Sequence, residues 1–370
     1  METKKYRFDE VTINFDKKRI PLSSAQREKR QGTFRYYGAQ GVIDHVDDYI
    51  YDGTYLLIAE DGENLKSKKQ NIAQVVDGQF WVNNHAHIVQ GNERCDTRFL
   101  CYLINSMDLS GYVTGSAQPK LSQANLNAIT LSLPTLVEQK RIVEYLYMLD
   151  QKIDVNRQIN DNLADLLQTV YQERFGDTSL IANQGILSDI CSYSRDKVAV
   201  SELNVSTYFS TENMLSGKAG STEATSLPTT SQTTACHKGD TLISNIRPYF
   251  KKIVYCEDNC GCSTDVLCFT PSQPRYSAYL FSTLYADKFF AFMVAGSKGT
   301  KMPRGDKQQI MTYPVVLPSE EELAGFNTIA SPLLEQIYSN SAENKRLSIL
   351  RDTLLPKLMS GEIDVSAIQL

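Results

Sequence analysis

The chain has 370 residues, of which 42% are hydrophobic and 22% charged, and its formal net charge at pH 7 is −5. These values are typical of an ordinary globular protein, and the length is sufficient for two domains. No apolar run approaches the roughly 18 residues of a membrane span, and the first residues do not resemble a secretory signal, so we expect a cytoplasmic protein with no membrane partner. The negative charge does not exclude nucleic acid, because binding requires only a local basic surface.

Residues 1–134 are predicted to form a first globule. Short β-rich runs alternate with turn signals, as where Tyr55–Ala59 follows Asp52-Gly53. A period typical of a helix appears only near Phe99–Met107. We therefore expect an α+β domain in this part of the chain.

Residues 135–179 are predicted to form a central helical connector. Thr135 and Glu138 have the spacing of a capping box, in which the two side chains bond free amides at the start of a helix. A short helix is expected to lead into a long one, with Asp150 as a cap near the boundary. The seam of the long helix steps by three and four residues, the period of a coiled coil. Its positions are Leu149, Ile153, Asn156, Asn160, Leu163, Leu167 and Val170.

Residues 180–318 repeat the character of the first globule. Gly239–Ser244 stands where Gly53–Ile58 stood, and Ser277–Phe292 is predicted to be the helix that corresponds to Phe99–Met107. We expect a second α+β domain here.

Residues 319–370 are predicted to form a C-terminal helical connector. Ser319 and Glu322 repeat the capping box, and Ser331 followed by Pro332 has the pattern of a second helix start. Because Arg351 stands where the first copy has Leu167, this end is expected to bind a partner or to face solvent. The predicted seam is Leu333, Ile337, Asn340, Asn344, Leu347, Arg351, Leu354 and Leu358.

The two halves of the chain are duplicates at nearly constant spacing. Three matches, 318 − 134, 340 − 156 and 344 − 160, all give an offset of 184 residues. A further match pairs Gly115-Ser116 and Lys120 with Gly296-Ser297 and Lys301. A repeat of this length indicates a duplicated domain with its connector, not a solenoid unit.

A lone helix with one apolar stripe must cover that stripe, and the obvious partner is its own copy. The predicted fold class is therefore α+β, with two similar α/β domains separated by a long antiparallel two-helix coiled coil. Residues 150–175 would span roughly 39 Å as a helix. In the alternative arrangement, each helix packs on its own globule and its asparagines face water. In the coiled coil, the register would be fixed by Asn156, Asn160, Asn340 and Asn344.

The motifs that carry most enzyme chemistry are missing from the sequence. We find no phosphate-binding loop, dinucleotide fingerprint, amino-methyltransferase tetrapeptide or zinc-protease motif. A zinc site has to be considered in the second half, but the spacing there is not paired CxxC and favours reduced thiols. We expect no catalytic residue, metal or cofactor in this chain. The residues considered for zinc are Cys236, Cys256, Cys260, Cys262, Cys268 and His237.

A protein that reads DNA needs phosphate anchors and a few base-edge readers on loops. Glycine lets the backbone approach, serine offers a hydroxyl, and lysine neutralises a phosphate. Aromatic and amide side chains on loops are candidate base readers, although each tyrosine is also suited to packing. The predicted DNA-binding residues are Tyr36, Tyr37, Gln40, Ser116, Lys120, Arg247, Tyr249, Lys252, Ser297, Lys301 and Arg304.

Several stretches together resemble the specificity (S) subunits of type I restriction-modification systems, and the resemblance covers essentially the whole chain. It implies two target-recognition domains, each binding one half of a bipartite double-stranded DNA target. It also implies two kinds of partner: modification (M) subunits, expected as two copies with S-adenosylmethionine and the adenine-methyltransferase site, and restriction (R) subunits with ATP- and Mg-dependent translocation and cleavage. The stretches are Phe34–Gly41, Tyr49–Gly62, Gly115-Ser116 with Lys120-Leu121, Leu133–Asn160 and Asn344–Gly361.

Three other classes of function remain open on the sequence. One is a DNA-binding repressor, although the sequence has no clear helix-turn-helix signal. A duplicated coiled-coil adaptor would assemble proteins without reading DNA, and would lack salt-sensitive binding to duplex DNA. An enzyme with degenerate motifs would transfer methyl groups or cleave DNA without partners.

Overall fold

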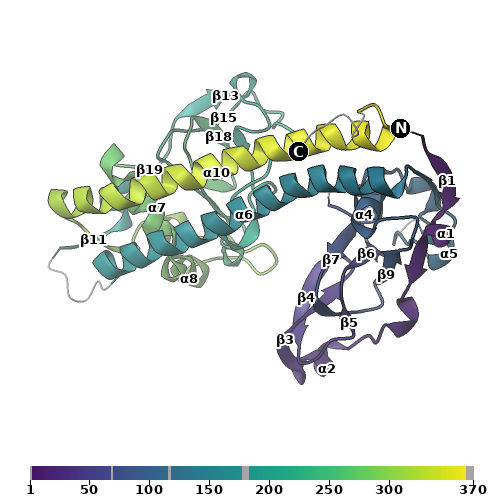
Figure 1. Ribbon diagram of the computed structural model, residues 1–370. Coiled ribbons are helices and arrows are strands. Elements are labelled where there is room, and N and C mark those ends of the chain that lie inside the picture. Colours follow the sequence, from purple (N-terminus) through teal and green to yellow (C-terminus); the bar gives the residue numbers. More distant parts are fainter. Residues whose placement is uncertain (1, 68–69, 116–117, 177–182, 364–370) are drawn as a thin grey trace. The chain divides into compact units, whose positions relative to one another are not determined.

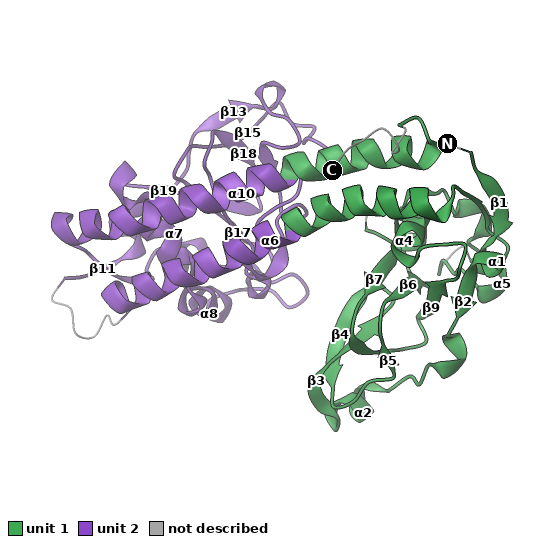
Figure 2. Cartoon of the chain, in the orientation of Figure 1, with its two compact units in different colours: residues 1–153, 345–370 green, residues 154–344 purple. Residues whose placement is uncertain are grey.

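The computed structural model describes residues 2–67, 70–115, 118–176 and 183–363. It contains two compact units, which Figure 2 colours separately. Unit 1 comprises residues 1–153 and 345–370, and unit 2 comprises residues 154–344. Both units combine sheets with helices, so the predicted α+β class is confirmed. Among the described residues, no helix is long and apolar enough to span a membrane.

Unit 1 contains two four-stranded sheets in the orders β2-β9-β6-β7 and β4-β3-β8-β5, and a separate antiparallel pair, β1 with β10. Helix α4 (Thr97–Ser106) packs against β6 and β7 and confirms the helix predicted near Phe99–Met107. The strands are β1 (Lys4–Arg7), β2 (Thr12–Asn14), β3 (Gln31–Gly38), β4 (Gly41–Val46), β5 (Tyr51–Asp52), β6 (Tyr55–Ala59), β7 (Ala73–Val76), β8 (Gln79–Val82), β9 (Ala86–Gly91) and β10 (Thr130–Leu133). The other short helices are α1 (Phe8–Val11), α2 (Ser24–Glu28), α3 (Asn64–Ser67) and α5 (Gln123–Asn127).

Unit 2 contains sheets in the orders β12-β19-β16-β17 and β13-β15-β18-β14, and the pair β11 with β20. The single helix predicted at Ser277–Phe292 is wrong, because the chain breaks there into α7 (Ser277–Tyr285) and α8 (Asp287–Ala295). The strands are β11 (Gln184–Ile186), β12 (Cys191–Tyr193), β13 (Lys197–Ala199), β14 (Tyr208–Phe209), β15 (Gln232–Cys236), β16 (Thr241–Ser244), β17 (Ile253–Tyr255), β18 (Cys260–Cys262), β19 (Val266–Pro271) and β20 (Pro314–Val316). A further short helix is α9 (Lys307–Ile310).

The sheet registers show which residues of the two units are equivalent. In unit 1 Leu57 of β6 lies opposite Ile88 of β9, and in unit 2 Leu242 of β16 lies opposite Cys268 of β19. The offset from β9 to β19 is therefore 268 − 88, or 180 residues, whereas the offset from β6 to β16 is 242 − 57, or 185 residues. The order of the first sheet is the same in both units, so the duplication seen in the sequence is also a duplication of topology.

The two long helices, α6 (Leu136–Phe175) and α10 (Glu320–Ser360), are each continuous. Both capping boxes are confirmed, because Thr135 N donates to Glu138 Oε2 over 2.9 Å and Ser319 N donates to Glu322 Oε2 over 2.8 Å. The predicted division into a short and a long helix is wrong. Pro332 lies inside α10, and its missing N–H is tolerated there because the neighbouring Ala330 and Leu334 are buried in the unit 2 core.

The helices run antiparallel to each other in unit 2, where the four seam asparagines meet in pairs. Asn156 Nδ2 donates to Asn344 Oδ1 over 2.9 Å, and Asn340 Nδ2 donates to Asn160 Oδ1 over 2.8 Å. Both pairs of residue numbers, 156 + 344 and 160 + 340, sum to 500, as antiparallel pairing requires. The proposed role of these asparagines in setting the register stays a prediction.

In unit 1 the same two helices also lie side by side (Figure 1). Arg351 of α10 is not simply solvated, because its Nη1 lies 2.7 Å from Asp150 of α6. Asp150 is not a helix cap; it also accepts a 2.5 Å hydrogen bond from Tyr102 of α4. Each helix thus packs on its copy and on a globule, since Ile142 and Leu146 of α6 and Leu358 of α10 join one core cluster. The predicted boundaries at 134, 179 and 318 stay predictions, because the compact units divide within the helices.

Candidate nucleic-acid interface

A turn in unit 1 brings Lys120 back beside Thr114 and next to Asp61, close to the end of β6. Thr114 and Lys120 exchange backbone hydrogen bonds of 2.9 and 2.8 Å. Gly115 is required in this turn, because its φ is +84° and a Cβ there would lie 2.3 Å from the carbonyl oxygen of Gln118. The adjacent Leu121 N donates to Glu60 O over 2.8 Å, which ties the turn to the residue that follows β6.

The same turn recurs in unit 2 with Arg304 as its cation. Lys298 and Arg304 exchange backbone hydrogen bonds of 2.9 Å each, and Gly299 has a φ of +102°. Gly305 N donates to Asn245 O over 3.3 Å, as Leu121 does to Glu60. The offsets 299 − 115 and 304 − 120 are both 184, the offset of the long helices.

This geometry corrects the match made from the sequence. The structural counterpart of Lys120 is Arg304, not Lys301, and that of Gly115 is Gly299, not Gly296. Gly296 ends helix α8 with a φ of −89°, so it does not serve the turn. The shared Gly-Ser dipeptide was therefore a coincidence of composition, whereas the left-handed glycine is the feature that the turn requires.

Each of these cations is held by a carboxylate while remaining half exposed. Lys120 Nζ lies 3.3 Å from Glu60 Oε1, and the Lys120 side chain is 54% exposed. Arg304 Nη2 lies 3.2 Å from Asp265 Oδ1, and the Arg304 side chain is 51% exposed. Exposed ion pairs of this kind contribute little to stability, so a phosphate can replace the carboxylate at low cost.

A buried hydrogen-bond network connects the Lys120 turn to the core of unit 1. His87 Nε2 donates to Leu121 O over 2.8 Å, and its Nδ1 lies 2.6 Å from Asp16 Oδ2. Burial tends to raise the pKa of Asp16, but the hydrogen bond to His87 and the charge of Arg19 lower it overall. Arg19 in turn lies 2.9 Å from Glu60, so the anchor carboxylate is itself fixed in place.

Two residues predicted as base readers in unit 1 are buried. Tyr36 and Tyr37 are 0% and 4% exposed, because both faces of β3 are covered at its C-terminal end, where Tyr36, Tyr37 and Gly38 are all buried. Leu22 N donates to the Tyr36 hydroxyl over 2.9 Å, and the Tyr37 ring packs edge-on against Phe80. Both tyrosines are core residues and present no surface for DNA.

Gln40 is exposed at the turn between β3 and β4. Its Nε2 lies 3.4 Å from the position that a Cβ on Gly62 would take. Gly62 N donates to Pro119 O over 3.2 Å, so Gln40 belongs to the same surface as the Lys120 turn. Ser116 lies outside the described residues.

In unit 2 a basic and aromatic loop follows β16. Arg247 and Lys251 have φ values of 51° and 50°, a conformation that costs energy for residues other than glycine and is concentrated at functional sites. Between them Tyr249 and Phe250 are 50% and 38% exposed, with ring centroids 4.8 Å apart. Arg247 N donates to Pro303 O over 2.7 Å, which holds the loop against the Arg304 turn.

The remaining predicted residues of unit 2 differ in their availability. Lys301 is exposed. The Ser297 hydroxyl donates to Val294 O over 2.7 Å, and Lys252 Nζ donates to Thr211 O over 2.6 Å. Burial lowers the pKa of Lys252, so its amine is less suited to a phosphate than Arg304 is.

Sequence reasoning missed the two carboxylates, Glu60 and Asp265, and the exposed ring of Phe250. Phe250 could have been found from its place between Tyr249 and Lys251. The carboxylates gave no local signal, because their partners lie far away in the sequence.

The cysteines considered for zinc form one buried cluster with Met214, Leu242 and Val266. Cys260 Sγ donates to Cys256 Sγ over 3.6 Å, and Cys268 Sγ donates to Asp240 Oδ2 over 3.2 Å. His237 stands apart, about half exposed and 3.8 Å from Asp240. Within the described ranges, no group of three or more histidine, cysteine or acidic side chains has the geometry of a metal site.

Comparison with known proteins agrees with this architecture. Residues 2–164 match the family described as type I restriction modification DNA specificity domain. A protein of Haemophilus influenzae assigned as a type I restriction enzyme specificity subunit is 36% identical over 138 residues, which are 37% of this chain and 35% of that protein. The EcoprrI specificity subunit of Escherichia coli is 26% identical over 125 residues, 33% of this chain and 30% of its own. These matches therefore span about a third of each relative's length.

A solved structure extends the likeness to the whole chain at the level of fold. The crystal structure of a type I restriction-modification S subunit from M. genitalium aligns with a TM-score of 0.59 at 16% identity, covering 97% of this chain and 96% of that one. The specificity-domain match thus covers residues 2–164, and the fold of the whole chain is that of the solved S subunit.

Proposed function

We propose that this chain is the DNA sequence-recognition subunit of a type I restriction-modification complex, with each unit reading one half of a bipartite target. The observation that carries the proposal is the recurrence of one cation-bearing turn, Lys120 in unit 1 and Arg304 in unit 2, at the same place in a duplicated topology. Two equivalent heads on one chain suit a target with two half-sites.

In this proposal Lys120 and Arg304 anchor phosphates, and the surrounding loops read base edges. Unit 1 offers the amide of Gln40, a side chain that can bond adenine at two points. Unit 2 offers Arg247 and Tyr249 on the strained loop, together with Lys301. Because the two surfaces carry different side chains, the two half-sites are expected to differ in sequence.

The chain itself is proposed to be non-catalytic and free of cofactors. Modification subunits, two per chain, would supply S-adenosylmethionine and methylate adenine, and restriction subunits would supply ATP- and Mg-dependent cleavage. An exposed apolar stripe on α6 supports a helical partner: Val155, Ile159 and Leu166 are 47%, 40% and 48% exposed at spacings of four and seven residues.

The continuous helices are proposed to set the gap between the half-sites. The 40 residues of α6 correspond to a length of roughly 60 Å, which matches about 18 base pairs at about 3.4 Å each. Inserting one heptad into both α6 and α10 is expected to change the preferred gap; an unchanged gap would contradict this role.

The proposal is tested by co-expressing the chain with the neighbouring modification subunit and mapping methylated adenines across the genome. We expect a bipartite motif with a fixed gap. Exchanging residues 1–134 for those of a relative should change one half of the motif and leave the other intact. A properly assembled complex that methylates no such motif would refute the proposal and favour an adaptor.

A further inference from the structure

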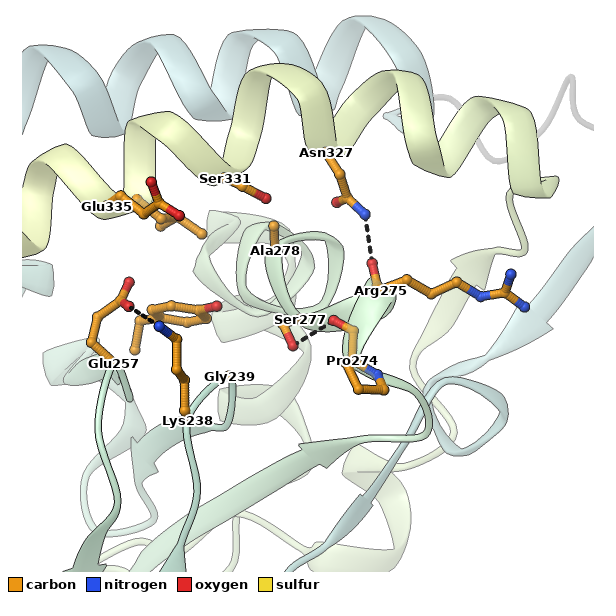
Figure 3. Close-up of a pocket in the computed structure, with 12 residues that line it drawn as sticks. Lys238, Gly239, Glu257, Pro274, Arg275, Ser277, Ala278, Asn327, Ser331 and Glu335 are labelled. Carbon is orange, nitrogen blue, oxygen red and sulfur yellow. Dashed lines mark hydrogen bonds and ion pairs between the residues drawn. The ribbon is translucent and has the colours of Figure 1, made fainter.

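Unit 2 has a cavity of about 400 Å³ between the flank of α10 and the β-sheet (Figure 3). None of its lining residues belongs to the Arg304 turn, and polar and apolar groups contribute about equally to the lining. Residues that define it include Tyr255, Glu257, Ala278, Asn327, Ser331 and Glu335.

In unit 1 the equivalent place is filled by the side chain of Arg98. Its Nη2 lies 2.9 Å from both carboxylate oxygens of Asp77, and its guanidinium lies 4.6 Å from the ring centre of Tyr147 on α6. The guanidinium is thus held between a carboxylate and a helix side chain.

The register identifies what unit 2 has at the same three positions. The residue numbers of β9 and α4 differ by 180 from those of β19 and α7 in unit 2. With this offset, Glu257 is the counterpart of Asp77 and Ala278 is the counterpart of Arg98. The long-helix offset of 184 makes Ser331 the counterpart of Tyr147. Unit 2 has therefore kept the carboxylate but replaced the arginine and the tyrosine with small residues, and the cavity is the space that they would occupy.

Glu257 lacks the close cation that Asp77 has. Its side chain is only 9% exposed, and among the described residues its ion-pair partner is Lys238 at 3.8 Å, beyond hydrogen-bond distance. Burial raises the pKa of Glu257, and the Lys238 charge opposes this only in part. A buried carboxylate with so distant a partner is stabilised by any cation that enters the cavity.

Two other groups in the cavity also favour a donor-rich cation. Glu335 adds a second carboxylate to the lining. Asn327 Nδ2 donates to Arg275 O over 2.8 Å. Asn327 Oδ1 is buried and has no hydrogen-bond partner in the described structure. The guanidinium of Arg275 points away from the cavity in Figure 3 and lies 2.6 Å from Glu320. The acceptors in the cavity are thus not served by that arginine.

We propose that this cavity binds the guanidinium group of an arginine side chain from a partner protein, in the place that Arg98 fills in unit 1. A guanidinium offers donors in a planar fork, which can pair with both oxygens of the Glu257 carboxylate, as Arg98 pairs with both oxygens of Asp77 in unit 1. An ammonium is a point charge and matches this arrangement less well. The phosphates of DNA are excluded by the two carboxylates, so the site is separate from the proposed DNA interface.

The test uses the full chain without DNA, so its result does not depend on the proposed function. Nα-acetyl-arginine amide and Nα-acetyl-lysine amide, which differ in the charged group and its stem, are titrated and followed by ligand-observed NMR. We expect several-fold tighter binding of the arginine amide. Glu257→Gln should abolish that preference, and Glu320→Gln, which alters a carboxylate outside the cavity, should preserve it.

A second variant copies unit 1 into unit 2. Ala278→Arg combined with Ser331→Tyr should fill the cavity, raise the melting temperature and remove binding of the arginine amide. Lys238→Ala should strengthen that binding, because it removes the competing cation. Equal binding of the two amides, or a preference that survives both Glu257→Gln and the filled cavity, would overturn the proposal.

Discussion

The two units build the interior between their sheets from different side chains. In unit 1 the interior contains Tyr51, Val76, Phe80, Val82 and Ile88. The equivalent residues of unit 2 are Cys236, Cys256, Cys260, Cys262 and Cys268. The offsets 256 − 76, 260 − 80, 262 − 82 and 268 − 88 are all 180, and Cys236 lies opposite Cys260 as Tyr51 lies opposite Phe80.

This difference shows that the backbone ladder, and not the identity of the core residues, is what the duplication has kept. Thiols bury less apolar area than aromatic and aliphatic side chains, so this layer of unit 2 gains less from the hydrophobic effect. Unit 2 has a large aromatic cluster elsewhere, where Tyr171 and Phe175 of α6 meet Tyr279 and Phe326. Its stability therefore depends more on α6 and α10 than on the interior between its sheets.

The largest expected effect comes from truncating equivalent core residues. Phe80→Ala should destabilise unit 1 by about 3–5 kcal/mol, and Cys260→Ala should destabilise unit 2 by only about 1–2 kcal/mol, because fewer contacts are lost. Hydrogen exchange of the β8 and β18 amides measures the two units separately. Equal losses would show that the thiol layer is as important as the aromatic one.

The second largest difference is expected at low pH, where unit 1 should lose stability before unit 2. The folded-state pKa of Asp16 is lowered below its ordinary value of 3.8, so its contribution is complete at neutral pH and is lost as the pH falls below that value. Unit 2 has Leu267 where unit 1 has the partner His87 (267 − 87 = 180). Exchange protection of β9 should therefore fall before that of β19 between about pH 5 and pH 2. Asp16→Asn should remove most of this difference; an unchanged difference would assign the acid sensitivity elsewhere.

Removing a proposed phosphate anchor should have a smaller effect that is the same for both units. Lys120→Ala and Arg304→Ala should each reduce the slope of log affinity against log salt by about 1, since each removes one phosphate contact. Duplex binding by the assembled complex at several salt concentrations gives the slope. Lys140→Ala, on the exposed face of α6, is the control that should leave it unchanged. A loss in only one unit would show that the turns are not equivalent.

The smallest expected effect concerns the polar seam of unit 2. A double-mutant cycle of Asn156→Leu and Asn344→Leu should give a coupling of about 0.5–1.5 kcal/mol, the range of one hydrogen bond. Denaturant unfolding of the four proteins measures it. Additive effects would mean that the 2.9 Å contact does not couple the helices.

Elements with strong local signals were predictable from the sequence. The capping boxes at Thr135 and Ser319 and the offset of 184 followed from side-chain chemistry and spacing, and the seam asparagines lie where that offset placed them. The burial of Tyr36 could not be predicted, because strand periodicity does not reveal whether a sheet is covered on both faces.

The errors arose where a local pattern competes with tertiary structure. The Gly-Ser match misplaced the second anchor by three residues, since only the backbone conformation shows which glycine makes the turn. The cavity beside Glu257 gave no signal at all. It exists because Ala278 and Ser331, which lie far apart in the sequence, are both small.

The proline inside α10 also has a consequence for the order of folding. Pro332 leaves the carbonyl of Thr328 without its usual amide donor and opposes helix propagation by about 3 kcal/mol. A free peptide covering this part of α10 should therefore be poorly helical on both sides of the proline. The segment is expected to form one continuous helix only when Phe326, Ala330 and Leu334 pack into the core of unit 2. Helix α10 is thus expected to form late, as a product of the folded domain and not as its nucleus.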